Sequence, residues 1–169
     1  MTNKEASAKQ ENLVAKYLGW KVVSGSGARP FRPGDVQNEH YLVECKTHTK
    51  EQKSLVFYKK HWDKIVKESR SVNKYPALIT DNGTQRVDST WVMIPKRVIT
   101  SESTNQILNL VNNSITNNSV NYNYEHVYLA YKNQHEVDAI NYISDNTFDE
   151  VAIISLSEFK RFYEEQFEC

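Results

Sequence analysis

Apolar and polar residues recur along the first hundred positions in patterns that predict two helices and a group of short strands. An apolar stripe runs along residues 4–18 at helical spacing up to Leu18, and Gly19 is a suitable residue to end that helix. Residues 59–72 also have helical spacing, with Trp62 on the apolar face. The expected strands are residues 20–24, 35–37, 40–48, 54–58, 76–80 and 90–94. This order predicts an α/β fold, in which a mixed central β-sheet is flanked by helices.

The pattern weakens beyond residue 100. There we expect helices over residues 104–111, 136–144 and 157–166, strands over residues 125–132 and 151–154, and a long Asn-rich loop over residues 109–123. Ser155 or Ser157 can cap the last helix. We therefore divide the chain into a core, residues 1–100, and a C-terminal α+β extension, residues 101–169, which packs on the core or at a dimer interface.

Length and composition fit one globular domain. A chain of 169 residues with 39% hydrophobic and 25% charged residues can bury a core and is too short for two full domains. No apolar run approaches the roughly 20 residues needed to cross a bilayer, and the polar N-terminus has no signal-peptide pattern. The two cysteines, Cys45 and Cys169, build neither a disulfide framework nor a zinc site. We expect a cytoplasmic protein without a membrane partner.

The formal net charge is zero, but the two parts of the chain carry opposite charge. Residues 1–100 contain 18 Lys and Arg against 10 Asp and Glu, whereas residues 101–169 contain 3 against 11. The resulting balances of +8 and −8 suggest that the first part meets a polyanion. The alternative is that the basic and acidic parts attract each other across the fold or across a dimer.

One segment combines residues that can carry chemistry. Asp35 is followed, after eight residues, by Glu44 and Lys46 inside the expected strand 40–48. Successive side chains of a strand point to opposite faces, so Glu44 and Lys46 share one face while Cys45 points to the other. Charged groups on an apolar strand are costly unless they pair or bind something. Asp35 follows a loop and can be brought beside Glu44 from a neighbouring strand; the alternative is a solvated Glu44–Lys46 pair on an edge strand.

A third carboxylate, Glu11, lies three residues before Val14 and seven before Leu18 on the apolar stripe of the first helix. There it faces the sheet and can complete a metal shell with Asp35 and Glu44; the alternative is a rim charge at the helix edge. Carboxylates and a strand carbonyl form the hard oxygen cage that Mg²⁺ takes, and we expect Mn²⁺ to substitute. Such an ion polarises a scissile phosphate and lowers the pKa of a bound water, which a lysine can position or deprotonate.

Two further stretches suit contacts with phosphate groups. Residues 24–34 form a Gly- and Ser-rich loop that lacks the ending of a P-loop, so nucleotide hydrolysis is not indicated. Residues 46–74 contain nine Lys and Arg against three acidic residues, which predicts a basic surface. A flexible connection and a solvated helix face are the alternatives. The candidate nucleic-acid contacts are Ser24, Ser26, Arg29, Arg32, Lys50, Lys53, Lys59 and Lys60.

Residues 8–80 resemble the archaeal and phage Holliday junction resolvases of the PD-(D/E)XK nuclease superfamily. The resemblance is carried by the helix AKQENLVAKYL, the strand and Gly/Ser loop GWKVVSGSGA, an aspartate, the strand YLVECKT, a basic stretch, and a helix leading into YPALIT. It implies a restriction-endonuclease-like core, Mg²⁺-dependent cleavage of DNA phosphodiesters and a homodimer. It also implies a catalytic set made of Glu11, Asp35, Glu44 and Lys46.

Two departures from the family pattern concern the loop and the second part of the chain. The insertion ARPFRPG before Asp35 leaves open whether Ser24 or Ser26 is the loop serine, and residues 101–169 have no counterpart in the compact archaeal enzymes. We therefore expect an endonuclease, a hydrolase that acts on DNA, with branched DNA as substrate and recombination as its process. The alternatives are a restriction-like, repair or RNA-directed nuclease with the same site, and a nucleic-acid-binding protein without catalysis.

Overall fold

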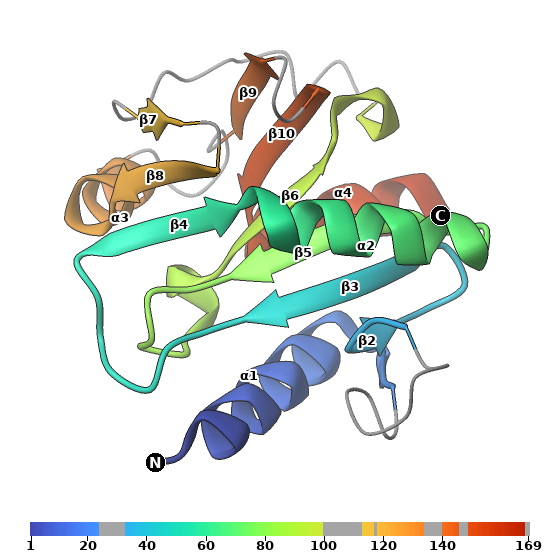
Figure 1. Ribbon diagram of the computed structural model, residues 1–169, viewed down its shortest axis with the longest axis horizontal. Helices are drawn as coiled ribbons and strands as arrows, with labels where there is room; N and C mark the ends of the chain where they lie inside the picture. Colours follow the sequence, from blue (N-terminus) through green and yellow to red (C-terminus); the bar gives the residue numbers. More distant parts are fainter. Residues whose placement is uncertain (24–32, 100–112, 117, 134–139, 146–148, 168–169) are drawn as a thin grey trace.

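The computed structural model describes residues 1–23, 33–99, 113–116, 118–133, 140–145 and 149–167 (Figure 1). Within these residues the elements form three layers, with the larger of two sheets in the middle.

The central sheet has seven strands in the order β1-β2-β3-β5-β6-β10-β9. In chain order they are β1 (Lys21–Val22), β2 (Val36–Gln37), β3 (Tyr41–Lys46), β5 (Tyr75–Thr80), β6 (Trp91–Pro95), β9 (Ile140–Asp145) and β10 (Asp149–Ser155). β3 and β5 are parallel, and the other neighbours are antiparallel. A parallel pair needs a crossover, which β4 and α2 provide here. The mixed α/β sheet flanked by helices that the sequence predicts is confirmed.

Different elements cover the two faces of this sheet. α1 (Asn3–Leu18) and α4 (Leu156–Phe167) pack on one face, where their apolar side chains meet Val43 and its neighbours. On the other face, Trp62 of α2 packs in a second apolar cluster with Leu42. The bounds of α2 are Lys59–Ser71.

A smaller sheet of three strands, in the order β4-β8-β7, lies on the α2 side. Its strands are β4 (Ser54–Tyr58), β7 (Asn113–Ile115) and β8 (Ser119–Asn123), and α3 (Tyr124–Asn133) follows β8. The buried side chains of Phe57 and Val120 join the same apolar cluster as α2. Two 3-10 helices, η1 (Val87–Ser89) and η2 (Lys96–Val98), flank β6.

The N-terminal helix is fixed at both ends. Thr2 Oγ1 accepts the Glu5 N–H at 3.1 Å, and the Glu5 carboxylate accepts the Thr2 N–H at 2.9 Å, which is a capping box. At the other end Gly19 has φ +75°, a left-handed conformation that glycine adopts without penalty. These two signals determine where α1 begins and ends.

Most expected elements are confirmed. The expected helices 4–18, 59–72 and 157–166 and strands 20–24, 35–37, 40–48, 54–58, 76–80, 90–94 and 151–154 each overlap a matching element. Ser155 caps α4, because its Oγ accepts the Glu158 N–H at 3.2 Å. The helix expected over residues 104–111 and most of the loop expected over residues 24–34 lie outside the described residues.

Three expectations for the second part of the chain are wrong. Residues 125–132 lie in a helix, α3, instead of a strand; residues 140–144 lie in a strand, β9, instead of a helix; and the loop expected over residues 109–123 contains β7 and β8. Asn123 Oδ1 accepts the His126 N–H at 3.2 Å and so caps α3. β8 pairs with β4, which is distant in the sequence, and local periodicity does not reveal such pairing.

Residues from the C-terminal part belong to the central sheet and its core. β10 pairs with β6 from Val151 opposite Pro95 to Ser155 opposite Trp91. Tyr163 of α4 packs edge-on against Trp20, with ring centroids 5.0 Å apart. The acidic and basic parts of the chain therefore share one core. No helix among the described residues is long and apolar enough to cross a membrane.

Candidate active site

The carboxyl ends of β3 and β5 meet at one edge of the central sheet, with Lys46 opposite Thr80 in the parallel register (Figure 1). α1 passes this edge, and Gln10 Nε2 donates to the Lys46 carbonyl oxygen at 2.6 Å. In α/β folds, ligands bind outside the carboxyl ends of such strands. A ligand site is therefore expected at this edge, near the residues that the sequence analysis selected.

Asp35 is brought beside Glu44 by the pairing of β2 with β3. Val36 lies opposite Val43, so the preceding residue, Asp35, lies opposite Glu44. The Asp35 N–H donates to the Val43 carbonyl oxygen at 2.7 Å, and Asp35 Oδ2 accepts the Cys45 N–H at 2.8 Å. The backbone therefore fixes this carboxylate against β3.

Glu44 is a buried carboxylate held by two lysines. Its side chain is 5% exposed, Lys46 Nζ lies 3.1 Å from its Oε1, and Lys64 Nζ lies 2.8 Å from its Oε2. Glu44 and Lys46 share a face of β3 as strand alternation predicts, while Cys45 belongs to the core on the other face. Burial raises the pKa of the Cys45 thiol, which leaves it neutral. Sequence reasoning missed Lys64, because only the packing of α2 brings it to β3.

Lys64 also connects Glu44 to the turn before Asp35. Its Nζ lies 3.0 Å from Glu68 Oε1, and Glu68 Oε2 accepts the Gly34 N–H at 2.9 Å. Gly34 has φ +73°, and a Cβ there would lie 2.6 Å from Leu42 Cδ1. Only glycine fits this turn without a shift of its neighbours. Through Lys64 and Glu68, α2 therefore contacts both Glu44 and the turn that precedes Asp35.

Glu11 of α1 belongs to the same electrostatic environment. Its pKa is raised to about 7, mainly by burial and further by the negative charges of Asp35 and Glu44, while Lys46 acts in the opposite direction. The charges of Asp35 and Glu44 therefore act on the Glu11 carboxyl at the end of β3. The sequence analysis expected Glu11, Asp35, Glu44 and Lys46 near one another, and the charges of the other three residues act on the Glu11 carboxyl.

The donor types at this site fit a hard divalent cation. Carboxylate oxygens and strand carbonyl oxygens are the ligands that Mg²⁺ prefers. The negative charges of Asp35 and Glu44 disfavour ionisation of Glu11, and a divalent ion at this site would offset that repulsion. As the side chains stand, no group of three or more His, Cys, Asp or Glu among the described residues is arranged to hold a metal ion.

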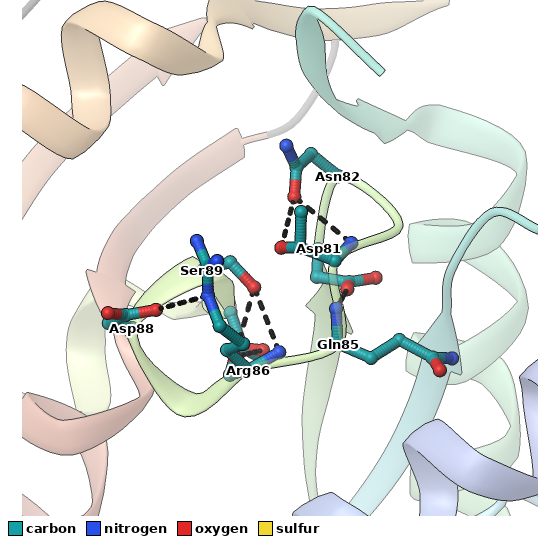
Figure 2. A network of polar contacts seen from close by, with 8 residues as sticks. Asp81, Asn82, Gln85, Arg86, Asp88 and Ser89 are labelled. Carbon is teal, nitrogen blue, oxygen red and sulfur yellow. Dashed lines mark hydrogen bonds and ion pairs between the residues drawn. The ribbon is translucent and has the colours of Figure 1, made fainter. Parts of the chain in front are cut away.

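A buried network next to the site was not predicted from the sequence. Asp81 follows β5, and its Oδ2 accepts the Gln85 N–H at 2.6 Å (Figure 2). Its Oδ1 accepts the Thr47 hydroxyl at 2.5 Å. Gln85 Nε2 donates to the Ala6 carbonyl oxygen of α1 at 2.6 Å. Burial raises the pKa of Asp81, although these hydrogen bonds act against the shift. The network ties the loop after β5 to α1 and to the end of β3.

His61 is a further group near the site. Its pKa is lowered to about 4, first by burial and then by Lys46 and Lys60, while Glu44 acts in the opposite direction. Its ring packs edge-on against Tyr58 at 5.6 Å between centroids. A histidine in this state is neutral at physiological pH, so it adds no positive charge for phosphate binding.

The expected nucleic-acid contacts divide into two groups. Ser24, Ser26, Arg29 and Arg32 lie outside the described residues. Lys50 and Lys53 are exposed in the loop between β3 and β4, and Lys60 is exposed at the start of α2. Lys59 is half-buried and forms an ion pair with Asp63 at 2.5 Å. The structure therefore leaves Lys50, Lys53 and Lys60 accessible to a polyanion.

No known protein family, curated protein or solved structure matches this chain.

Proposed function

We propose that this protein is a Mg²⁺-dependent endonuclease that hydrolyses phosphodiester bonds in DNA, with Mn²⁺ able to substitute. The observation that carries the proposal is the convergence of Glu11, Asp35 and Glu44 with Lys46 at the carboxyl end of β3, where the pKa of Glu11 is raised to about 7. A purely structural ion pair with Lys46 would need only one carboxylate, whereas Glu11, Asp35 and Glu44 all lie in its electrostatic environment. A carboxyl group whose pKa is raised by burial and by neighbouring negative charges, as for Glu11, is typical of functional sites.

Each residue of the site has a role in this proposal. Glu11, Asp35 and Glu44 would hold the ion, which supplies polarisation of the scissile phosphate and a lowered pKa of a bound water. Lys46, held beside Glu44, orients the attacking water and offsets the negative charge that develops on the phosphate. Lys64 neutralises Glu44 from the α2 side in the absence of substrate.

We further propose branched DNA as the substrate, recombination as the process, a homodimer as the active form and the cytoplasm as the compartment. The resemblance of residues 8–80 to Holliday junction resolvases supports the substrate and the dimer, because two symmetric cuts in a junction need two sites at a fixed separation. The exposed lysines of the β3–β4 loop and of α2 support binding of a polyanion.

The experiment that tests the proposal is a cleavage assay on a four-way junction, a plain duplex, a single strand and RNA, each with and without Mg²⁺. Cleavage of the junction only with the metal, by a protein that light scattering shows to be a dimer, is the expected result. A metal-dependent cut in plain duplex or RNA would favour a restriction-like, repair or RNA-directed nuclease. Binding without any cut would favour a non-catalytic nucleic-acid-binding protein.

A further inference from the structure

A cavity of about 790 Å³ lies between the loop before β4, the loop after β5 and the start of α3. Its lining includes two cations, Lys53 and Arg86, two tyrosines, Tyr124 and Tyr128, and two carboxylates, Glu51 and Glu125. This volume falls within the range of about 300–1,000 Å³ that is usual for small-ligand sites. None of these residues has a role in the proposed cleavage reaction.

Hydrogen bonds between the three segments fix the walls of this cavity. The Gln52 N–H donates to the Asn82 carbonyl oxygen at 2.7 Å, and Asn82 Nδ2 donates back to the Gln52 carbonyl oxygen at 3.2 Å. The Tyr124 N–H, at the start of α3, donates to the Lys53 carbonyl oxygen at 2.8 Å. The cavity is therefore formed before any ligand arrives, which lowers the entropic cost of binding.

One loop connects the cavity to the candidate active site. Asp81, at the beginning of this loop, accepts a hydrogen bond from Thr47 beyond the end of β3. Arg86 lies five residues later in the same loop (Figure 2). Arg86 Nε donates to Asp88 Oδ1 at 3.1 Å. The loop of residues 81–86 therefore contacts the end of β3 through Asp81 and lines the cavity through Arg86.

The chemistry of the lining selects among ligands. Glu51 and Glu125 balance Lys53 and Arg86, so the cavity does not present the uniform positive charge that a phosphate backbone alone requires. Tyr128 is partly exposed, and its ring centroid lies 6.1 Å from that of Tyr124. Aromatic rings stack on nucleobases, carboxylates accept base N–H groups, and guanidinium groups bind phosphate oxygens. One nucleotide offers all three kinds of group.

We propose that this cavity binds a single unpaired nucleotide of the nucleic-acid strand that reaches the active site. The base enters beside Tyr128, and Arg86 and Lys53 contact the phosphate. Base-paired DNA cannot fill the cavity, because its bases are stacked inside the duplex. This cavity would give the protein a preference for branched, flapped or single-stranded substrates. Binding in the cavity does not depend on the proposed function; only the cut that follows rests on it.

The test is fluorescence-anisotropy binding in EDTA at fixed salt, with a short single strand, the same strand carrying abasic positions, and a duplex. The variants are Tyr128→Leu and Arg86→Gln. Matched controls are Tyr75→Leu, 38% exposed at the start of β5, and Arg97→Gln, exposed in η2 and outside the basic stretch 46–74. RNA and DNA versions of the strand decide which sugar the site accepts.

The expected result is that Tyr128→Leu weakens single-strand binding about tenfold, within the range seen for loss of one stacked base, and leaves duplex binding unchanged. The abasic strand should bind the wild-type protein as weakly as the intact strand binds Tyr128→Leu, and the controls should bind like wild type. Equal binding of abasic and intact strands, or equal weakening on duplex, overturns the proposal. Binding is measured in EDTA, so its outcome does not depend on the proposed nuclease function. Absence of cleavage in the separate assay with Mg²⁺ would refute the nuclease function and leave this binding result unchanged.

Discussion

Lys64 Nζ of α2 lies 2.8 Å from Glu44 Oε2 of β3, and this ion pair joins the crossover helix to the carboxylate at the centre of the candidate site. The Glu44 side chain is 5% exposed and that of Lys64 is 50% exposed. Because Glu44 is buried, its charge needs a cation beside it, whereas the exposed Lys64 can pair with Glu68 or with water instead. Lys64 is therefore a counter-ion that a divalent metal can displace.

Replacement of Lys64 by Met should strengthen metal binding. The ammonium and the metal compete for the same carboxylate, and two positive charges at Glu44 repel each other. We expect Mn²⁺, titrated calorimetrically without nucleic acid, to bind about twofold to fivefold more tightly, because a half-exposed pair contributes at most about 1 kcal/mol. Lys67→Met, on an exposed position of the same helix, should bind as wild type. Weaker binding in Lys64→Met would show that Lys64 supports the site instead.

Replacement of Glu44 by Gln, or of Asp35 by Asn, should abolish metal-dependent cleavage and leave substrate binding intact. Each change removes one carboxylate while the exposed lysines that supply affinity remain. We expect the single-turnover rate to fall by at least about a thousandfold, as when essential groups are removed from other hydrolases. Glu39→Gln, in the exposed turn between β2 and β3, is the matched control. A near wild-type rate in either variant would exclude this carboxylate cluster as the catalytic centre.

Replacement of Glu11 by Gln should stabilise the protein above neutral pH. Its folded pKa of about 7 lies above the ordinary value of 4.5, so the folded state holds a proton that the unfolded state has lost. The resulting loss of stability is absent below the ordinary pKa, grows as pH rises, and is complete above about pH 7. We expect the variant to melt about 2–4 °C higher at about pH 8, equally at about pH 4, and to lose cleavage. A lower melting temperature at the higher pH would place Glu11 in a stabilising ion pair.

Alanine at Gly34 should cost more stability than alanine at Gly19. Both glycines have positive φ, but a Cβ at Gly34 meets Leu42 Cδ1 at 2.6 Å, whereas a Cβ at Gly19 has no neighbour within 4 Å. Backbone strain is therefore common to the two variants, and overpacking adds about 1–3 kcal/mol at Gly34. Urea unfolding of the two variants measures this difference directly. Equal free energies of unfolding would mean that Leu42 moves aside without cost.

The sequence by itself determined the features that depend on local period and on chain-end signals. Strand alternation assigned Glu44 and Lys46 to one face of β3 and Cys45 to the core. Helical spacing directed Glu11 toward the sheet, and Gly19 marked the end of α1. Strand alternation and helical spacing are patterns that extend over a few neighbouring residues, so a short stretch of sequence is enough to reveal them.

Only the tertiary structure decided the partners that come from distant segments. Lys64 meets Glu44 because α2 packs across β3, and Asp81 reaches Thr47 because β5 ends beside β3. The strand state of residues 119–123 was decided in the same way, since β8 forms by pairing with β4. Such contacts become favourable only when two remote surfaces bury each other, and a short stretch of sequence holds just one of the two surfaces.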